Sequence, residues 1–406
     1  MLNVVHISTS SFGGAGKAAF RLHEGMLNRT DINSTFITAD TIYNPGPHQI
    51  NITLKKINVF YRIANRLGIY LLNAQRNYHR LKCLSGNFEI FSMPTTDYTL
   101  EKLEVIKNAD IIHLHWIANF INYPSFFKAF KHKPIVWTLH DMNPFMGGFH
   151  YKNDYLNNKS YHALESYLVK IKYNAIQKAE NLHVIAPSNW LMNEAVNSGM
   201  FKSSTQYRVI PNSINLEIFK PIEKKEARIH LSITDDLPCI LMVAEYYNHQ
   251  RKGFDLLIEA LMSIDSRTFQ VISVGSNKFN FDTSFRVTEL GILKSEKLFA
   301  MAYSSADLFV LPSREDNLPN VMLESFACGT PVLSFKTGGM QDWIIPDFNG
   351  LFANSTDAEG LKIALENFIK TKQRFDSKKI REFAIANFSQ QEQASNYNDI
   401  YQSLIN

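Results

Sequence analysis

Residues 312–332 read PSREDNLPNVMLESFACGTPV, and this stretch decides the fold. Apolar runs flank it at 307–311 and 331–335, and each has the length and composition of a buried strand. Between them, Pro319 is suited to the first position of a helix that ends at Gly329. The order of strand, acidic loop, helix and strand is that of a βαβ unit in a parallel sheet.

The same alternation of short apolar runs and helical segments extends along the whole chain. Strands are expected at 3–8, 34–39, 110–115, 134–140, 182–186, 207–211, 239–244, 269–274, 285–290, 307–311, 331–335 and 350–353. Helices are expected at 16–28, 101–107, 161–179, 188–198, 253–263, 295–304, 319–327, 357–370, 377–387 and 389–405. This pattern predicts an α/β protein of two doubly wound, Rossmann-like domains, each with its ligand-binding loops at the carboxyl ends of its strands.

The length supports two domains, because single cores rarely grow beyond roughly 250–300 residues and this chain has 406. A segment with prolines and clustered charges at 214–222 separates the two halves. We therefore place the first domain at 1–216 and the second at 217–387. The remaining stretch, 388–406, is expected to form a helix that packs back toward the first domain.

Composition narrows the class of protein. Hydrophobic residues make up 45% of the chain and charged residues 20%, and the net charge is only +4, so we expect a globular protein without a nucleic-acid groove. The three cysteines, Cys83, Cys239 and Cys328, are too far apart for a disulfide framework or a zinc cluster. With no secretory signal and no apolar run of about 18–20 residues, a cytoplasmic location is expected.

A stretch at 55–82 mixes basic, aromatic and aliphatic residues and has two interpretations. It could rest on an anionic membrane surface at the inner face of the cell membrane. It could equally be an ordinary amphipathic helix with a solvated basic face.

The glycine-rich turn STSSFGGAGKAAFR at 8–21 is ambiguous by itself. A P-loop is disfavoured because Ser11 replaces its first glycine and Ala18 replaces its magnesium-binding hydroxyl residue. A dinucleotide fingerprint is partly matched by Gly14-x-Gly16-x-x-Ala19 with Asp40 after the next strand. Alternatively, the glycines only let the strand turn tightly into a helix, whose N-terminal N–H groups attract anions.

Two acids around the helix that begins near Pro319 carry the strongest chemical signal. Asp316 and Glu324, with seven residues between them, could bind the hydroxyls of a sugar nucleotide while the helix N-terminus meets its phosphates. Glu315 is a rival for Asp316. No Asp-x-Asp occurs, so the usual carboxylate pair for a nucleotide-bound divalent ion is missing.

Stretch 312–332 resembles the signature of glycosyltransferase family 4, in which two glutamates with seven residues between them precede ACGTPV. The resemblance continues in other motifs, which are the glycine loop at 13–16, WTLHDMNPFMGG at 137–148, VIPNSI at 209–214, RKGFDLL at 251–257 and Gly338-Gly339. Within that family, the sequence resembles the members that assemble colanic acid, capsule or O-antigen polysaccharides. The resemblance implies a GT-B architecture of two domains that face each other across a cleft.

The resemblance also implies roles for individual residues. Catalysis is expected at His140, Asp316, Arg251 and Lys252. Donor binding is expected at Gly14, Gly16, Glu315, Leu318, Pro319, Asn320, Val321, Glu324, Gly338 and Gly339. Acceptor binding is expected at Gly13, His115, Trp116 and Asp141. Neither a metal nor a cofactor is expected beside the nucleotide-diphosphate sugar.

Some positions depart from the commoner family pattern or keep an alternative open. Glu245 stands where many relatives place an arginine, and Asp316 is one methylene shorter than the usual glutamate. His113 and His115 share a strand face and could bind a metal, but no third ligand is evident, so packing or acceptor contact is favoured. The resemblance implies a retaining, metal-independent glycosyltransferase that moves a sugar from a nucleotide-diphosphate donor to a lipid-linked saccharide acceptor in cell-surface polysaccharide synthesis. The alternatives are a nucleotide-sugar epimerase and a catalytically degenerate sugar-binding or scaffold subunit.

Overall fold

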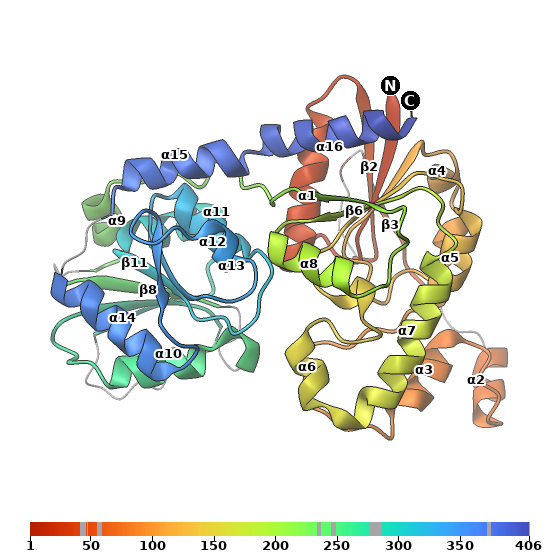
Figure 1. The fold of residues 1–406 in the computed structure, drawn as a ribbon, viewed down its shortest axis with the longest axis horizontal. Helices are drawn as coiled ribbons and strands as arrows, with labels where there is room; N and C mark the ends of the chain where they lie inside the picture. The colour runs from red at the N-terminus through yellow and green to blue at the C-terminus, as the bar shows by residue number, and fades with distance from the viewer. Residues whose placement is uncertain are drawn as a thin grey trace. The chain divides into compact units, whose positions relative to one another are not determined.

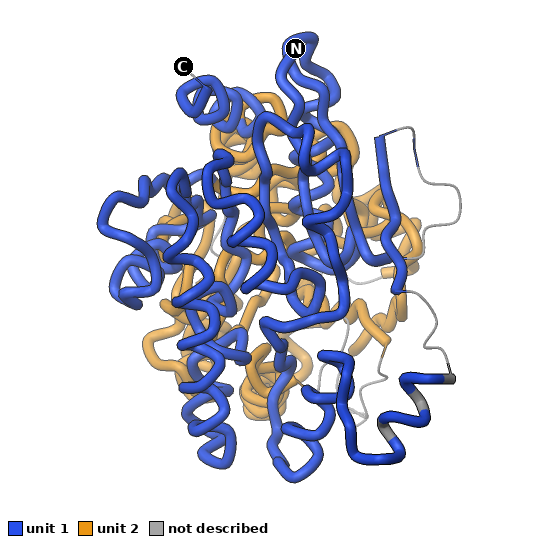
Figure 2. The backbone as a smooth tube through the Cα atoms, turned by 90° about the vertical axis from the view of Figure 1, so that its right-hand side faces the viewer, with its two compact units in different colours: residues 1–210, 393–406 blue, residues 211–392 orange. Residues whose placement is uncertain are grey.

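A computed structural model describes residues 1–40, 46, 48–54, 59–233, 237–244, 249–276, 286–371 and 375–405. The chain divides into two compact units (Figure 2). Unit 1 comprises residues 1–210 and 393–406, and unit 2 comprises residues 211–392. The sequence prediction placed the junction after residue 216, and the boundary between the units lies after Ile210.

Unit 1 is built on a parallel sheet with the strand order β3-β2-β1-β4-β5-β6-β7. Its strands are β1 Leu2–Ile7, β2 Ile32–Thr38, β3 Gln49–Asn51, β4 Ile111–Leu114, β5 Ile135–Thr138, β6 Leu182–Ala186 and β7 Gln206–Val209. Strand β1 pairs with β2 on one side and with β4 on the other, so the order of the strands reverses there. Ligands of open α/β sheets bind beside such a switch point, at the carboxyl ends of the strands.

Helices cover both faces of this sheet (Figure 1). The helices of this unit are α1 Gly13–Leu27, α2 Val59–Arg66, α3 Asn73–Leu81, α4 Glu104–Lys107, α5 Tyr123–Ala129, α6 Lys152–Asn157, α7 His162–Ile176, α8 Asn189–Asn197 and, from residue 393 on, α16 Gln390–Ile405. Helices α5, α7 and α8 contribute to the core on one face. Leu22 and Met26 of α1 share the core of the other face with Tyr397 and Tyr401 of α16.

Unit 2 repeats the architecture with the strand order β10-β9-β8-β11-β12-β13. Its strands are β8 Cys239–Val243, β9 Gln270–Val274, β10 Val287–Gly291, β11 Leu308–Leu311, β12 Val332–Phe335 and β13 Gly350–Ala353. Its helices are α9 Lys224–His230, α10 Phe254–Met262, α11 Glu296–Ser305, α12 Asn320–Ala327, α13 Met340–Trp343, α14 Ala358–Thr371 and α15 Ser377–Phe388. Strands β8, β9, β11 and β12 are buried along their whole length, as parallel strands covered on both faces should be.

The structure contains both predicted Rossmann-like sheets and corrects two local predictions. Pro319 is not the first helical residue: its ψ of 126° is extended, and α12 begins at Asn320. Helix α1 begins at Gly13 and not at residue 16, and Gly13 has a φ of 70°, a conformation that glycine adopts without strain. Within the described residues, no helix combines the length and hydrophobicity needed to cross a bilayer.

Candidate functional site

In unit 2, loops from the ends of neighbouring strands bring three charged side chains together. The short helix η4, Gln250–Lys252, follows β8 in the chain, and Asp316 follows β11. Lys252 Nζ lies 2.6 Å from Asp316 Oδ2, and Arg251 NH1 lies 3.3 Å from the same oxygen. Arg251 also donates to the carbonyl oxygen of Glu315. The two adjacent cations that the sequence singled out therefore converge on one carboxylate.

The charge balance keeps Asp316 ionised. Burial alone would raise the pKa of its carboxyl group, but the charges of Lys252 and Arg251 and the hydrogen bond from Lys252 outweigh burial and lower the pKa. The side chains of Arg251 and Asp316 are only 9% exposed. Two fixed cations beside one buried carboxylate suit the binding of an anion such as a diphosphate.

Two glycines allow the loops of this cluster to approach each other. A Cβ atom at Gly253 would lie 1.9 Å from the carbonyl oxygen of Pro312, and one at Gly338 would lie 1.9 Å from that of Asp316. Both residues also have positive φ angles, 66° and 55°. Gly339 N–H donates to the carbonyl oxygen of Asp316, so the predicted Gly338-Gly339 turn contacts the acidic loop directly.

The other predicted donor-binding residues lie in or beside α12. Glu315 and Leu318 are buried in the loop, Pro319 precedes the helix, and Asn320 and Val321 open it. Glu324 is 6% exposed, one turn further along, and its Oε2 accepts from the Tyr303 hydroxyl group at 3.1 Å. Its predicted contact with ribose stays a prediction.

In unit 1, the glycine turn follows β1. Gly13 and Gly14 are exposed and have open space where a side chain would be, whereas a Cβ at Gly16 would lie 2.6 Å from the carbonyl oxygen of Ser10. Asp40 accepts from the hydroxyl group of Ser11 at 2.9 Å and so binds the turn itself. A dinucleotide fingerprint needs this acid for ribose, so the contact argues against that interpretation.

Histidines gather at the carboxyl ends of β1, β4 and β5, where His6 and His115 are buried and His140 is partly buried. His6 Nδ1 lies 3.0 Å from His115 Nε2, and His115 Nδ1 lies 3.3 Å from His140 Nε2. Burial lowers the pKa of His140 to about 4, although neighbouring Asp141 opposes the shift. His115 was predicted to contact the acceptor, but its ring is 1% exposed and both nitrogens face other histidines. His6 was not singled out in the sequence.

Asp141 organises the loop that follows β5. Its carboxylate accepts from His150 Nδ1 at 2.6 Å, from the Trp116 indole at 2.9 Å and from the backbone N–H of Asn143 at 2.9 Å. Burial would raise the pKa of Asp141, but His150 and these hydrogen bonds lower it. The structure thus joins the predicted residues Trp116 and Asp141, and it gives Asp141 partners within the protein.

Two charged residues of α7 support this loop and were missed in the sequence. Glu165 accepts from the backbone N–H groups of Gly147 at 2.6 Å and Gly148 at 2.7 Å, and Lys172 Nζ donates to Asn143 Oδ1 at 3.0 Å. Burial lowers the pKa of Lys172 to about 7 against the opposing charges of Glu165 and Asp141. Glu165 and Lys172 both lie on the buried face of α7. A charged residue at a position where the helical period expects an apolar one was the signal in the sequence that could have revealed them.

The two Rossmann-like units, with a cation cluster at the strand ends of one and a glycine turn and histidine at those of the other, define a protein of the GT-B class. The model of Glycosyltransferase Family 4 matches residues 12–218, and that of Glycosyl transferases group 1 matches residues 238–371. The first match covers more than half of the chain, so the chain belongs to glycosyltransferase family 4.

Relatives and solved structures agree with this assignment. The lipopolysaccharide core biosynthesis glycosyltransferase LpsE of Rhizobium meliloti is 32% identical over 35% of this chain and 42% of its own length. An uncharacterized glycosyltransferase, MJ1607, of Methanocaldococcus jannaschii is 28% identical over 68% of this chain and 71% of its own. The match to LpsE therefore spans less than half of that relative.

Two solved structures share the fold over nearly the whole chain. Sucrose-phosphate synthase of Thermosynechococcus elongatus superposes with a TM-score of 0.69 at 20% identity, covering 100% of this chain and 99% of its own. Anabaena Alr3699/HepE, solved in complex with UDP-glucose, superposes with a TM-score of 0.65 at 15% identity. The match covers 99% of this chain and 100% of the Anabaena chain.

Proposed function

We propose that this family-4 chain is a retaining, metal-independent glycosyltransferase that moves a sugar from a nucleotide-diphosphate donor to a lipid-linked saccharide in cell-surface polysaccharide synthesis. The observation that carries the proposal is the convergence of Arg251 and Lys252 on Asp316 at the strand ends of unit 2. Such fixed cations stabilise a departing diphosphate without reorganising during the reaction. The role in polysaccharide synthesis is supported by the similarity to LpsE.

In the proposed reaction, an acceptor hydroxyl oxygen forms a bond to the anomeric carbon while the bond from that carbon to the diphosphate oxygen breaks. Attack occurs on the face from which the diphosphate leaves, so the anomeric configuration is retained. The proton of the hydroxyl passes to the departing diphosphate. Arg251 and Lys252 stabilise its negative charge, Glu324 accepts from the ribose, and His140 donates to the sugar.

The first test is nucleotide binding. Thermal melts with UDP, GDP, ADP and their sugar conjugates should show one nucleotide that raises the unfolding temperature by roughly 5–10 °C at about 100 times its dissociation constant. Glu324→Ala should weaken this binding, whereas Glu359→Ala, which changes an exposed acid of α14, should not. The absence of any shift would favour the scaffold alternative, and product formed without an acceptor would favour the epimerase.

A lipid-linked acceptor is supported by the exposed surface of α2 and α3. Large apolar side chains are exposed on α2 and directly after it, including Phe60 at 65%, Ile63 at 51% and Leu67 at 72%. Arg66, Arg76, Arg80 and Lys82 add positive charge in the same two-helix region. Exposed apolar side chains with flanking basic residues are typical of helices that lie on anionic bilayers. Residues 55–58 of the predicted stretch lie outside the described residues.

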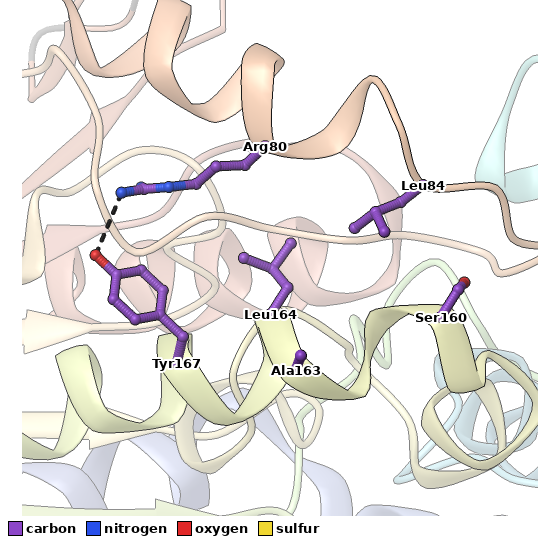
Figure 3. A pocket seen from close by; sticks show the side chains of 6 residues that line it. All are labelled: Arg80, Leu84, Ser160, Ala163, Leu164 and Tyr167. Carbon is purple, nitrogen blue, oxygen red and sulfur yellow. Dashed lines mark hydrogen bonds between the residues drawn. The ribbon is translucent and has the colours of Figure 1, made fainter.

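A groove of about 510 Å³ adjoins this region between α3 and α7 (Figure 3). Leu84, Ala163 and Leu164 supply apolar lining. Arg80 lies over the ring of Tyr167, 5.1 Å from its centroid, and donates to its hydroxyl group. An apolar lining with a cation at its edge suits the chain and phosphate of an anionic lipid.

Vesicle binding tests the membrane part of the proposal. The protein should cosediment with phosphatidylglycerol vesicles and weakly with phosphatidylcholine vesicles, since basic residues add affinity only for the anionic surface. The double variant Ile63→Ser, Leu67→Ser should bind the anionic vesicles about tenfold or more weakly, because each change removes an exposed apolar side chain. Leu156→Ser, a change of a 52% exposed leucine on α6, is the control. Equal binding by all three proteins would contradict a membrane role for α2.

A further inference from the structure

Three imidazole rings of unit 1 form one continuous chain. His6 lies in β1, His115 directly after β4 and His140 shortly after β5. The nitrogen pairs are His140 Nε2 with His115 Nδ1 at 3.3 Å and His115 Nε2 with His6 Nδ1 at 3.0 Å. His6 is 0% exposed and His115 1% exposed. The chain thus runs from His140, the predicted catalytic histidine, into the interior of unit 1.

A fourth histidine, His113, lies against the chain without being a link in it. Its ring centroid is 4.8 Å from that of His6 and 4.0 Å from that of His115. Its Nδ1 pairs with the Tyr401 hydroxyl at 2.6 Å and its Nε2 with that of Thr138 at 2.8 Å. His6, His113 and His115 have the spacing of a three-histidine metal group, but metal binding by His113 would break one of these hydrogen bonds.

The chain allows only two arrangements of protons when its rings are neutral. Each N···N pair contains one N–H donor and one bare nitrogen, and each neutral ring carries one proton. The donors therefore all point toward His6 or all point toward His140. Burial favours the neutral rings, because it lowers the pKa of each of the three histidines.

The inner end of the chain distinguishes the two arrangements. His6 Nε2 is buried and has no hydrogen-bond partner among the described residues. If the donors pointed toward His6, this atom would be a buried N–H without an acceptor, which is rarer in proteins than an under-used acceptor. With the donors pointing toward His140, the atom is a bare nitrogen. His6 Nδ1–H then donates to His115, and His115 Nδ1–H donates to His140.

We propose that His6 and His115 are positioning residues that hold His140 in the Nδ1–H tautomer by donating, through the chain, to its Nε2. The ring nitrogen of His140 that faces away from the chain is then a hydrogen-bond donor and not a proton acceptor. The consequence for catalysis rests on the proposed function: His140 donates to a substrate oxygen, and the acceptor's proton goes to the leaving diphosphate. The tautomer itself is independent of that function.

The experiment is nitrogen-15 NMR of the full chain labelled at histidine, recorded without substrate. The His140 signals are assigned by their loss in His140→Gln. We expect the wild-type protein to show His140 protonated at Nδ1 alone, and His6→Phe to convert it to a mixture or to the Nε2–H form. His183→Gln, which changes a half-buried histidine of β6 outside the chain, should leave the tautomer as it is.

Two results would overturn the proposal. One is a wild-type His140 protonated at Nε2, a result that needs no variant to fold. The other is one equivalent of zinc in elemental analysis with histidine signals that move on chelation, since metal binding would replace the chain. If glycosyl transfer is not found but the Nδ1–H tautomer is, the proposed function fails and the tautomer assignment stands.

Discussion

Replacing Arg251 with methionine should lower the rate of sugar transfer by roughly 10²- to 10³-fold, the range expected when one fixed donor to a developing negative charge is removed. Arg251 is well placed for this role because its guanidinium group is buried beside Asp316 and held by the Glu315 carbonyl oxygen. The loss should appear mainly in kcat, because charge builds on the diphosphate only as its bond to the sugar breaks. The measurement is steady-state kinetics with the donor identified by thermal melts.

The control for this experiment is Arg267→Met, which removes an arginine that is 87% exposed and pairs with Asp265 on the surface of unit 2. Its rate should match that of the wild-type protein. Lys252→Met should also lower the rate of sugar transfer, but by less than Arg251→Met does. The reason is that the Lys252 side chain is 30% exposed, so water screens its charge. A folded Arg251 variant with an unchanged kcat would exclude Arg251 from stabilising the leaving group.

The sheets could be predicted from the sequence because parallel strands buried on both faces are short, continuous apolar runs. Strand β8, CILMV, and strand β11, LFVL, are of this kind. Strand β3, QIN, was missed because it is three residues long and has no apolar run. Helix α9, with the polar sequence KKEARIH, lacks the apolar stripe that reveals a helix.

The candidate site could be predicted only as separate motifs. Arg251 and Asp316 are 65 positions apart in the sequence. Their loops come together because β8 pairs with β11, and neither motif indicates that pairing. His6 was missed for the same reason: it becomes the neighbour of His113 only through the register of β1 with β4. Glycines 253 and 338 matched family motifs, but the close approaches that require them are visible only in the folded chain.

Acidification from pH 7.5 to 5 should lower the free energy of unfolding of unit 1 by at least about 4 kcal/mol. Burial lowers the pKa of His23 and of His140 to about 4, whereas an unfolded histidine titrates near 6.5. Between these values the unfolded chain binds the proton and the folded chain does not, so stability is complete above pH 6.5 and falls as the pH falls toward 4. Each residue contributes about 2 kcal/mol at pH 5.

Three further histidines act in the same direction, because burial also lowers the pKa values of His6, His113 and His115. The carboxylates Asp141 and Asp316 lose their contribution only near and below their unfolded pKa of about 4, so histidines dominate the change between pH 6.5 and 5. Urea unfolding, followed by tryptophan fluorescence at several pH values, measures how the free energy of unfolding changes with pH. Since total stabilities are about 5–15 kcal/mol, the loss should be large enough to bring unit 1 close to unfolding at pH 5.

Two variants test whether buried histidine rings cause this pH dependence of the free energy of unfolding. His23→Gln keeps a polar group beside the Ser34 hydroxyl, which His23 Nδ1 contacts at 2.7 Å, but removes a titrating ring, so the pH dependence should weaken by about one proton. His132→Gln changes an exposed histidine that pairs with Glu180 on the surface and should leave most of the slope in place. A wild-type stability that is flat from pH 7 to 5 would mean that the histidines of unit 1 are accessible to protons in the folded state, contrary to the burial of His6, His23, His113 and His115.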